Sequence, residues 1–198
     1  MDWKEFLDFM SLAERLKCNT RHCTNSQGNP ESVAEHSWRA ALMALCLEQE
    51  LPGVEMDRVI RMLLIHDLGE AVTGDIPTFC KSKEDEAVED QAVENILSTL
   101  PPATRHEFAG LFAEMNALET PEARLYKVID KLEAVIQHNE SPISTWEALE
   151  YQLQREYGQR EAQWFPQTAA LREAILRQTE EKIAAEGEGE LGQLALEV

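Results

Sequence analysis

The stretch RVIRMLLIHDLGEAV, residues 58–72, decides the fold class of this 198-residue chain. Its apolar residues recur at the i, i+3, i+4 spacing of one helical face, and His66 and Glu70 continue the same face. Asp67 lies on the adjoining face. We therefore predict a helix over residues 57–72 whose core-facing side carries or borders a histidine and two carboxylates.

These polar residues need a partner in the protein interior. A carboxylate buried without one costs several kcal/mol, so it must be paired, protonated or bound to a cation. Cationic side chains are scarce, because 18 Lys and Arg residues face 37 Asp and Glu residues. A divalent metal is the more economical partner, and histidine with aspartate suits Mn²⁺, Fe²⁺, Co²⁺, Ni²⁺ or Zn²⁺. A hydrogen-bonded His-Asp pair without any metal remains the alternative at this point.

Helical patterns recur along the rest of the chain. A capping box of Ser32 and Glu35 starts a helix that we expect to end near residue 50. Thr120 followed by Pro121 starts another, which runs to about residue 139. Further helices are expected over residues 2–17, 84–100, 104–118, from 144 onward, and 166–185. No segment shows the period-two alternation of a strand, so we predict an all-α fold.

Length and charge limit the organisation and the partners. The chain is long enough for one domain with a substantial core, which we assign to residues 1–186, followed by a flexible acidic tail over 187–198. The net charge of -19 disfavours binding to nucleic-acid polymers or anionic membranes. No stretch approaches the roughly 20 apolar residues of a membrane span. The N-terminus has no signal-peptide pattern, so we expect a cytoplasmic protein with free thiols.

Two further polar residues lie on helices of their own. His36 lies in an Ala/Leu-rich helix and, taken alone, could be a hydrogen-bonded core histidine or a surface residue. Asp130 lies on the flank of the strongest apolar stripe and, taken alone, could be an exposed partner of Lys127 or Lys131. Together with the His-Asp pair they give an ordered set of ligand-type side chains on three predicted helices.

In this order and context the residues resemble the HD-domain metal-dependent phosphohydrolases. The segments ESVAEHS (31–37), IHDLGEAVTGDIP (65–77) and KVIDKLEAV (127–135) are similar to the branch of YfbR-like 5′-deoxyribonucleotidases. The resemblance spans roughly residues 12–137. It implies a single-domain, multi-helix HD-domain fold and an enzyme that removes phosphate from 5′-deoxynucleoside monophosphates.

The resemblance also implies a role for each matching residue. One divalent cation would be held by His36, His66, Asp67 and Asp130. Glu70 would be the catalytic carboxylate, and Asp75 would lie beside the substrate and the attacking water. Arg21 would contact the nucleotide, and Lys127 could add positive charge at the phosphate, although a solvated surface lysine is an equal alternative. Two-metal members carry extra histidines before the last aspartate, and only His106 falls in that interval here, so we expect a single metal.

The substrate stays open at this stage. The branch commonly has a tryptophan shortly after the arginine, whereas His22 and Cys23 follow Arg21 in this chain. A second hypothesis is therefore an HD phosphohydrolase that acts on another nucleotide or a small phosphate ester. A third is a non-catalytic metal-binding or nucleotide-binding module. Glu70 and Asp75 argue against the third, because a pure binder has little use for a carboxylate beside a phosphate.

The C-terminal part of the chain carries an aromatic cluster. It consists of Trp146, Tyr151, Tyr157, Trp164 and Phe165. These side chains either pack within the domain or contribute to a homodimer interface, and the family resemblance also implies a homodimer.

Overall fold

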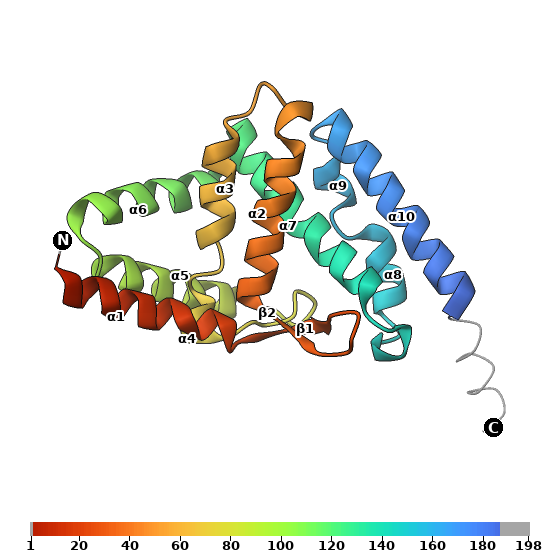
Figure 1. Ribbon diagram of the computed structural model, residues 1–198, viewed down its shortest axis with the longest axis horizontal. Coiled ribbons are helices and arrows are strands. Elements are labelled where there is room, and N and C mark those ends of the chain that lie inside the picture. Colours follow the sequence, from red (N-terminus) through yellow and green to blue (C-terminus); the bar gives the residue numbers. More distant parts are fainter. Residues whose placement is uncertain (1, 187–198) are drawn as a thin grey trace.

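Three helices in mutual contact form the centre of the molecule. In the computed structural model, which describes residues 2–186, they are α2 (Val33–Leu47), α3 (Met56–Ile65) and α7 (Pro121–Glu140). Figure 1 shows α7 crossing α2 and α3 at an angle. The all-α prediction is confirmed. The expected acidic tail, residues 187–198, lies outside the described residues.

The remaining helices flank this centre on two sides (Figure 1). One side holds α1 (Trp3–Ala13), α4 (Glu70–Thr73), α5 (Lys83–Ser98) and α6 (Pro102–Ala117). The other side holds α8 (Glu150–Glu156), α9 (Gln159–Ala162) and α10 (Pro166–Glu186). Short 3₁₀ turns cover Glu14–Lys17, Glu48–Glu50 and Ile143–Thr145. Along residues 2–186 no helix is both long and apolar enough to cross a membrane.

The capping signals fix where α2 and α7 begin. The Ser32 hydroxyl accepts from the backbone N–H of Glu35, and the Glu35 carboxylate accepts from that of Ser32 at 2.7 Å, which completes the predicted capping box. The Thr120 hydroxyl accepts from the backbone N–H of Ala123 and so caps α7, with proline at the first helical position. Both starts agree with the sequence.

Two other helix starts were predicted wrongly. The helix expected from residue 104 begins at Pro102, because a proline fits the first turn and lacks only an N–H that would have no partner there. The helix expected from residue 144 begins at Glu150. Trp146, which lies between residue 144 and Glu150, has an extended backbone. Its indole is buried and stacked on His138 at a centroid distance of 4.6 Å.

A small antiparallel sheet was not predicted at all. It lies in the polar segment after α1 and consists of β1 (Thr20–Thr24) and β2 (Pro30–Ser32). Its strands are too short to show a period-two pattern. The turn between them is closed by the Asn25 side chain and by Gly28, whose φ is +79°. Gln137 of α7 donates to the Thr24 carbonyl at 2.7 Å, so the sheet is held against the central helices.

The helix predicted over residues 57–72 is interrupted where its polar residues lie. α3 ends at Ile65, and α4 begins only at Glu70. Between them the N–H of Leu68 donates to Ile65 O, and that of Glu70 donates to Asp67 O, both at 3.0 Å. These are the i to i−3 bonds of a 3₁₀ turn, which is tighter than an α-helix and frequently marks a functional segment.

Gly69 lets this turn lie close to α5. A Cβ atom at this position would come within 2.7 Å of Glu89 Cγ and 3.2 Å of the Glu89 backbone oxygen. Any larger residue would therefore push α5 away from the turn.

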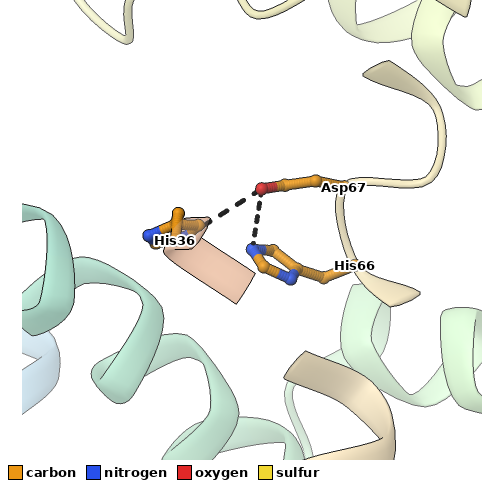
Figure 2. A group of neighbouring side chains, drawn as sticks. All are labelled: His36, His66 and Asp67. Carbon is orange, nitrogen blue, oxygen red and sulfur yellow. Dashed lines mark ion pairs between the residues drawn. The ribbon is translucent and has the colours of Figure 1, made fainter. Parts of the chain in front are cut away.

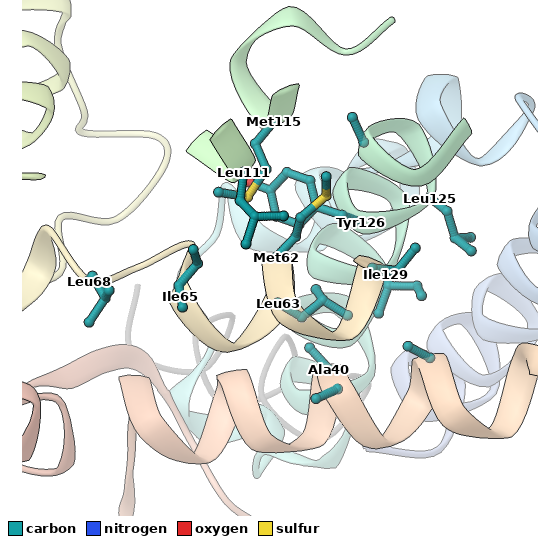
Figure 3. Close-up of a cluster of buried hydrophobic side chains, with 14 of the residues drawn as sticks. Ala40, Met62, Leu63, Ile65, Leu68, Leu111, Met115, Leu125, Tyr126 and Ile129 are labelled. Carbon is teal, nitrogen blue, oxygen red and sulfur yellow. The ribbon is translucent and has the colours of Figure 1, made fainter. Parts of the chain in front are cut away.

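The apolar core packs around α3 and the turn that follows it. Figure 3 shows side chains from several helices meeting there, among them Met62 and Leu63 of α3, Leu111 and Met115 of α6, and Leu125 and Ile129 of α7. A second cluster joins the other face of α7 to α9 and α10 through Val128, Leu132, Ala162 and Ile175. Because α7 is buried on both sides, its polar side chains have fixed positions.

Candidate metal centre and adjoining pocket

Four side chains from three segments converge at the centre of the molecule. His36 comes from α2, His66 and Asp67 from the 3₁₀ turn, and Asp130 from α7. His66 Nε2 lies 3.1 Å from Asp67 Oδ2 and 3.6 Å from Asp130 Oδ1. His36 Nε2 lies 3.2 Å from Asp130 Oδ1 and 3.9 Å from Asp67 Oδ2. Figure 2 shows the Asp67 carboxylate directed at both imidazoles.

The donor atoms have the spacing and orientation of a divalent-metal site. Ligand atoms at about 2.1 Å from one cation lie about 3.0–3.4 Å apart, close to the distances between these side chains. The Nδ1–H of His66 donates to the Leu63 carbonyl at 2.9 Å, and that of His36 donates to Glu133. Each Nε2 therefore directs a lone pair at a carboxylate oxygen, and His66 Nε2 is buried without a hydrogen bond. A cation between these atoms removes the repulsion.

Without a metal, only added protons could balance the negative charge of the two carboxylates in this cluster. Burial lowers the pKa of His66, yet Asp67 and Asp130 outweigh burial and raise that pKa well above its ordinary value. Burial likewise opposes ionisation of Asp130, but Lys127 and the two histidines hold its pKa well below the usual range. Burial opposes ionisation of Asp67 as well, but His66 and His36 lower its pKa to about 2, so both carboxylates are ionised.

Glu70 lies beside this cluster at the start of α4. Its side chain is buried, and Oε2 forms no hydrogen bond. Burial, followed by the charges of Asp67, Asp75 and Glu89, raises the pKa of Glu70 to about 9. A carboxyl group that holds a proton near neutral pH next to a metal centre is suited to general acid–base chemistry.

Arg21 and Asp75 lie between the cluster and a pocket of about 100 Å³, and both line that pocket. Arg21 is half-buried on β1, with Nε 3.4 Å from Glu31 Oε2. Burial acts against its charge, but Asp67, Glu133 and Glu31 outweigh it and raise the pKa of Arg21. Asp75 follows Gly74, and burial raises its pKa. A permanent positive charge and a titratable carboxyl thus face the same space.

Two other candidates from the sequence are placed differently. Lys127 Nζ donates to Asp130 Oδ2 at 2.9 Å, and its side chain is 34% exposed, so it lies next to a ligand carboxylate rather than on a distant surface. His106 is exposed on α6 and makes no contact with the cluster. The interval between the His-Asp pair and Asp130 therefore supplies no further histidine to the centre.

Glu133 is a functional residue that the sequence analysis missed. It is 0% exposed, accepts from His36 Nδ1 through Oε2, and accepts from Arg39 Nε through Oε1 at 2.6 Å. A carboxylate on the far nitrogen of a ligand histidine fixes the tautomer and the ring orientation. The available signal was an acid inside the apolar stripe, one helical turn after Asp130.

His138 lines the pocket at the other end of α7. Its ring is stacked on Trp146, and Nε2 is buried without a hydrogen bond, although Glu150 Oε2 lies 3.5 Å away. Burial, followed by the neighbouring His22 and Lys182, lowers the pKa of His138 to about 4. The imidazole is therefore neutral at physiological pH.

Comparison with known proteins agrees with this architecture. A family model described as "HD domain" matches residues 13–172. The chain belongs to the HD domain family.

Among curated relatives, the 5′-deoxynucleotidase HDDC2 of Dictyostelium discoideum is 35% identical over 142 residues, which cover 67% of this chain and 75% of that protein. The human HDDC2 is 31% identical, with 69% and 68% covered. The Escherichia coli 5′-deoxynucleotidase YfbR is 30% identical, with 63% and 67% covered. The predicted resemblance is confirmed.

Solved structures have the same fold. A predicted metal-dependent phosphohydrolase from Magnetospirillum magnetotacticum is similar with a TM-score of 0.76 at 26% identity, covering 91% of this chain and 93% of the other. The cyanophage S-2L HD phosphohydrolase DatZ, solved with dA and one catalytic Zn²⁺ ion, has a TM-score of 0.57 at 23% identity, with 88% and 96% covered. At that identity DatZ supports the fold alone.

Glu133→Ala should weaken metal binding about 10–100-fold, because the His36 ring loses the group that orients it. Titration calorimetry of the metal-free protein with Mn²⁺ measures the change. Glu140→Ala is the matched control, since Glu140 accepts from the same Arg39 at 2.6 Å but its side chain is 49% exposed. Wild-type affinity in Glu133→Ala would contradict the orienting role.

His138 should make the fold sensitive to acid. Its folded pKa of about 4 lies below the ordinary value of 6.5, so the unfolded chain binds the proton more readily. The stability present at pH 7 is then lost as the pH falls from 6.5 toward 4. Between pH 7 and pH 5, the wild type should lose about 1–2 kcal/mol more unfolding free energy than His138→Gln in urea titrations. Equal losses would mean that protonation of His138 carries no penalty.

Proposed function

We infer that this chain is a divalent-metal-dependent 5′-deoxynucleotidase, which releases phosphate from 5′-deoxynucleoside monophosphates. One observation carries the inference: His36, His66, Asp67 and Asp130 form a His₂Asp₂ cluster with a buried carboxyl beside it, in a chain whose curated relatives over two thirds of its length are 5′-deoxynucleotidases. We assign one cation to the cluster, with ligands His36, His66, Asp67 and Asp130. Mn²⁺, Co²⁺, Fe²⁺, Ni²⁺ and Zn²⁺ all suit this donor set.

A bound cation would supply two effects, a lower pKa for a water molecule and neutralisation of charge on the phosphoryl oxygens. The side chains of the chain do the rest. Arg21, whose charge is kept by three carboxylates, binds the phosphate. Lys127 adds a second positive charge next to Asp130. The substrate phosphate thereby meets cations in an otherwise acidic protein.

The reaction also needs a proton to move. A water oxygen forms a bond to phosphorus and loses a proton, the bond from phosphorus to the 5′ oxygen breaks, and that oxygen gains a proton. We assign the second of these proton transfers to Glu70, because its buried carboxyl lies beside the cluster and its raised pKa of about 9 keeps a proton on it near neutral pH for the 5′ oxygen. Asp75, which shares the pocket wall with Arg21, orients the water and the sugar.

A second candidate function keeps the same chemistry on another nucleotide or a small phosphate ester. It is favoured by His22 and Cys23, which line the pocket where the branch commonly has a tryptophan. A non-catalytic binding module is less well supported, because it gives no reason to bury Glu70 without a hydrogen-bond partner.

We further propose that residues 1–186 form one domain and that the protein is a cytoplasmic homodimer. The four cysteines, all in the described part of the chain, form no disulfide, as a reducing compartment requires. The aromatic cluster is a poor candidate for the interface, since Trp146 is 7% exposed. An apolar stripe on α2 is a better one, formed by Trp38, Leu42 and Leu45, which are 63%, 42% and 54% exposed.

Metal-stripped protein should release no phosphate, and added Mn²⁺ or Co²⁺ should restore release from deoxynucleoside monophosphates above release from ribonucleotides. His66→Ala should lose metal binding, whereas Glu70→Gln should bind metal normally and lose at least about 100-fold in kcat, the usual size of a general acid–base contribution. Phosphate assays and calorimetry measure the two effects. Full activity in Glu70→Gln would exclude its catalytic role.

In light scattering the wild type should have twice the 22.5 kDa mass of the chain. Leu42→Glu should give the monomer, because a charge cannot be buried against a second α2 without a partner. Leu149→Glu, at an apolar residue that is 45% exposed outside the stripe, should remain a dimer. A monomeric wild type would remove the proposal.

A further inference from the structure

The pocket next to the metal centre is large enough to hold more than a phosphate. Its volume of about 100 Å³ is several times the roughly 10–15 Å³ that a cavity needs to hold one water molecule. Arg21 and Asp75 form the part nearest the cluster, and the lining continues over the loop after α4 to α7 and α8. A monophosphate bound at the cluster would therefore place its remaining atoms in this pocket.

Part of the lining suits the faces of a flat ring. Pro77, Phe79, Leu153 and Tyr157 contribute apolar or aromatic surface. The Phe79 ring is further held edge-on against His22 at a centroid distance of 5.3 Å. Such walls bind an aromatic base without distinguishing one base from another.

Gln154 adds a hydrogen-bond acceptor with a fixed direction. Its side chain is 5% exposed, and its Nε2 donates to Val135 O and to Asn139 Oδ1, both at 3.0 Å. Because the Val135 carbonyl can only accept, the amide cannot be reversed. Both N–H groups are thus committed, and Oε1 is the polar atom that remains for the pocket.

Glu150 adds a second acceptor from the first turn of α8. The residue is 4% exposed, and Oε2 accepts from the backbone N–H of Glu147 at 2.6 Å. His22 Nε2 lies 3.4 Å from Oε1, and His138 Nε2 lies 3.5 Å from Oε2. A carboxylate offers about four lone-pair sites, so Glu150 retains capacity for a ligand. Burial raises the pKa of Glu150, and His22 partly offsets this, whereas His138 is neutral.

We propose that Glu150 and Gln154 recognise the nucleobase of the substrate through its N–H donors and thereby select guanine over thymine, an inference that rests on the proposed 5′-deoxynucleotidase function. Guanine presents the N1–H and the N2 amino group side by side, which matches a carboxylate and a carbonyl. Thymine presents one N–H between two carbonyl oxygens. These oxygens would face the oxygens of Glu150 and Gln154, and no hydrogen bond can form between two acceptors. A site that is built to accept hydrogen bonds from donors strongly rejects a ligand that lacks those donors.

The test compares kcat/KM for the four deoxynucleoside monophosphates with metal-loaded enzyme. The wild type should prefer dGMP over dTMP at least about tenfold, with dAMP and dCMP between them because each has one amino group beside an acceptor. Glu150→Gln keeps an oxygen for the Glu147 N–H but presents an amino group to the base. It should lower kcat/KM for dGMP at least about tenfold and raise that for dTMP, a reversal that loss of structure cannot produce.

Glu147→Gln is the matched control. Glu147 also lies near His22, at 3.6 Å, but its side chain is 52% exposed and does not line the pocket. The dGMP to dTMP ratio should stay at the wild-type value in this variant. Equal kcat/KM for all four substrates, or an unchanged ratio in Glu150→Gln, would overturn base recognition while leaving the 5′-deoxynucleotidase intact.

Absence of phosphate release from every monophosphate would instead overturn the proposed function. Calorimetric binding of dGMP and dTMP to metal-loaded Glu70→Gln separates the two cases, because it requires no turnover. Tighter binding of dGMP, lost on adding Glu150→Gln, would support base recognition by itself. Equal affinities would overturn it.

Discussion

The structure depends on the meeting of two imidazole nitrogens and two carboxylates at one buried point. Each Nε2 atom is turned inward by a hydrogen bond on the opposite side of its ring, from His36 to Glu133 and from His66 to the Leu63 carbonyl. Such an arrangement is unfavourable unless positive charge lies at the centre. The apolar faces of α2, α3 and α7 hold it together by packing on both sides of α7. Core packing thus pre-forms the candidate metal site, and a bound cation would compensate for the buried charge.

The 3₁₀ turn between α3 and α4 carries two consecutive residues of the candidate metal centre. Their polar atoms, His66 Nε2 and Asp67 Oδ2, lie 3.1 Å apart. Gly69 makes the turn compatible with α5, because no side chain fits between its backbone and Glu89.

Sequence patterns predicted the parts of the fold that depend on local chemistry. The capping box at Ser32 and the Thr-Pro start of α7 are set by neighbouring residues, and the ordered His, His-Asp and Asp residues were sufficient to indicate the metal centre. The short β-sheet, the late start of α8 at Glu150 and the interrupted helix depend on contacts with distant segments. Glu133 was missed for the same reason, because its partner His36 is 97 residues away along the chain.

α7 fixes the distance between two parts of the candidate site. Asp130 of the metal centre and His138 of the pocket lie eight residues apart on this one helix, which corresponds to about 12 Å along its axis. Because both residues belong to one helix, relative motion of separate elements cannot change the distance between their backbones. A single-residue insertion between these two positions would rotate one end by about 100° relative to the other. The spacing between the candidate metal centre and the His138 side of the pocket thus depends on a residue count rather than on any one contact.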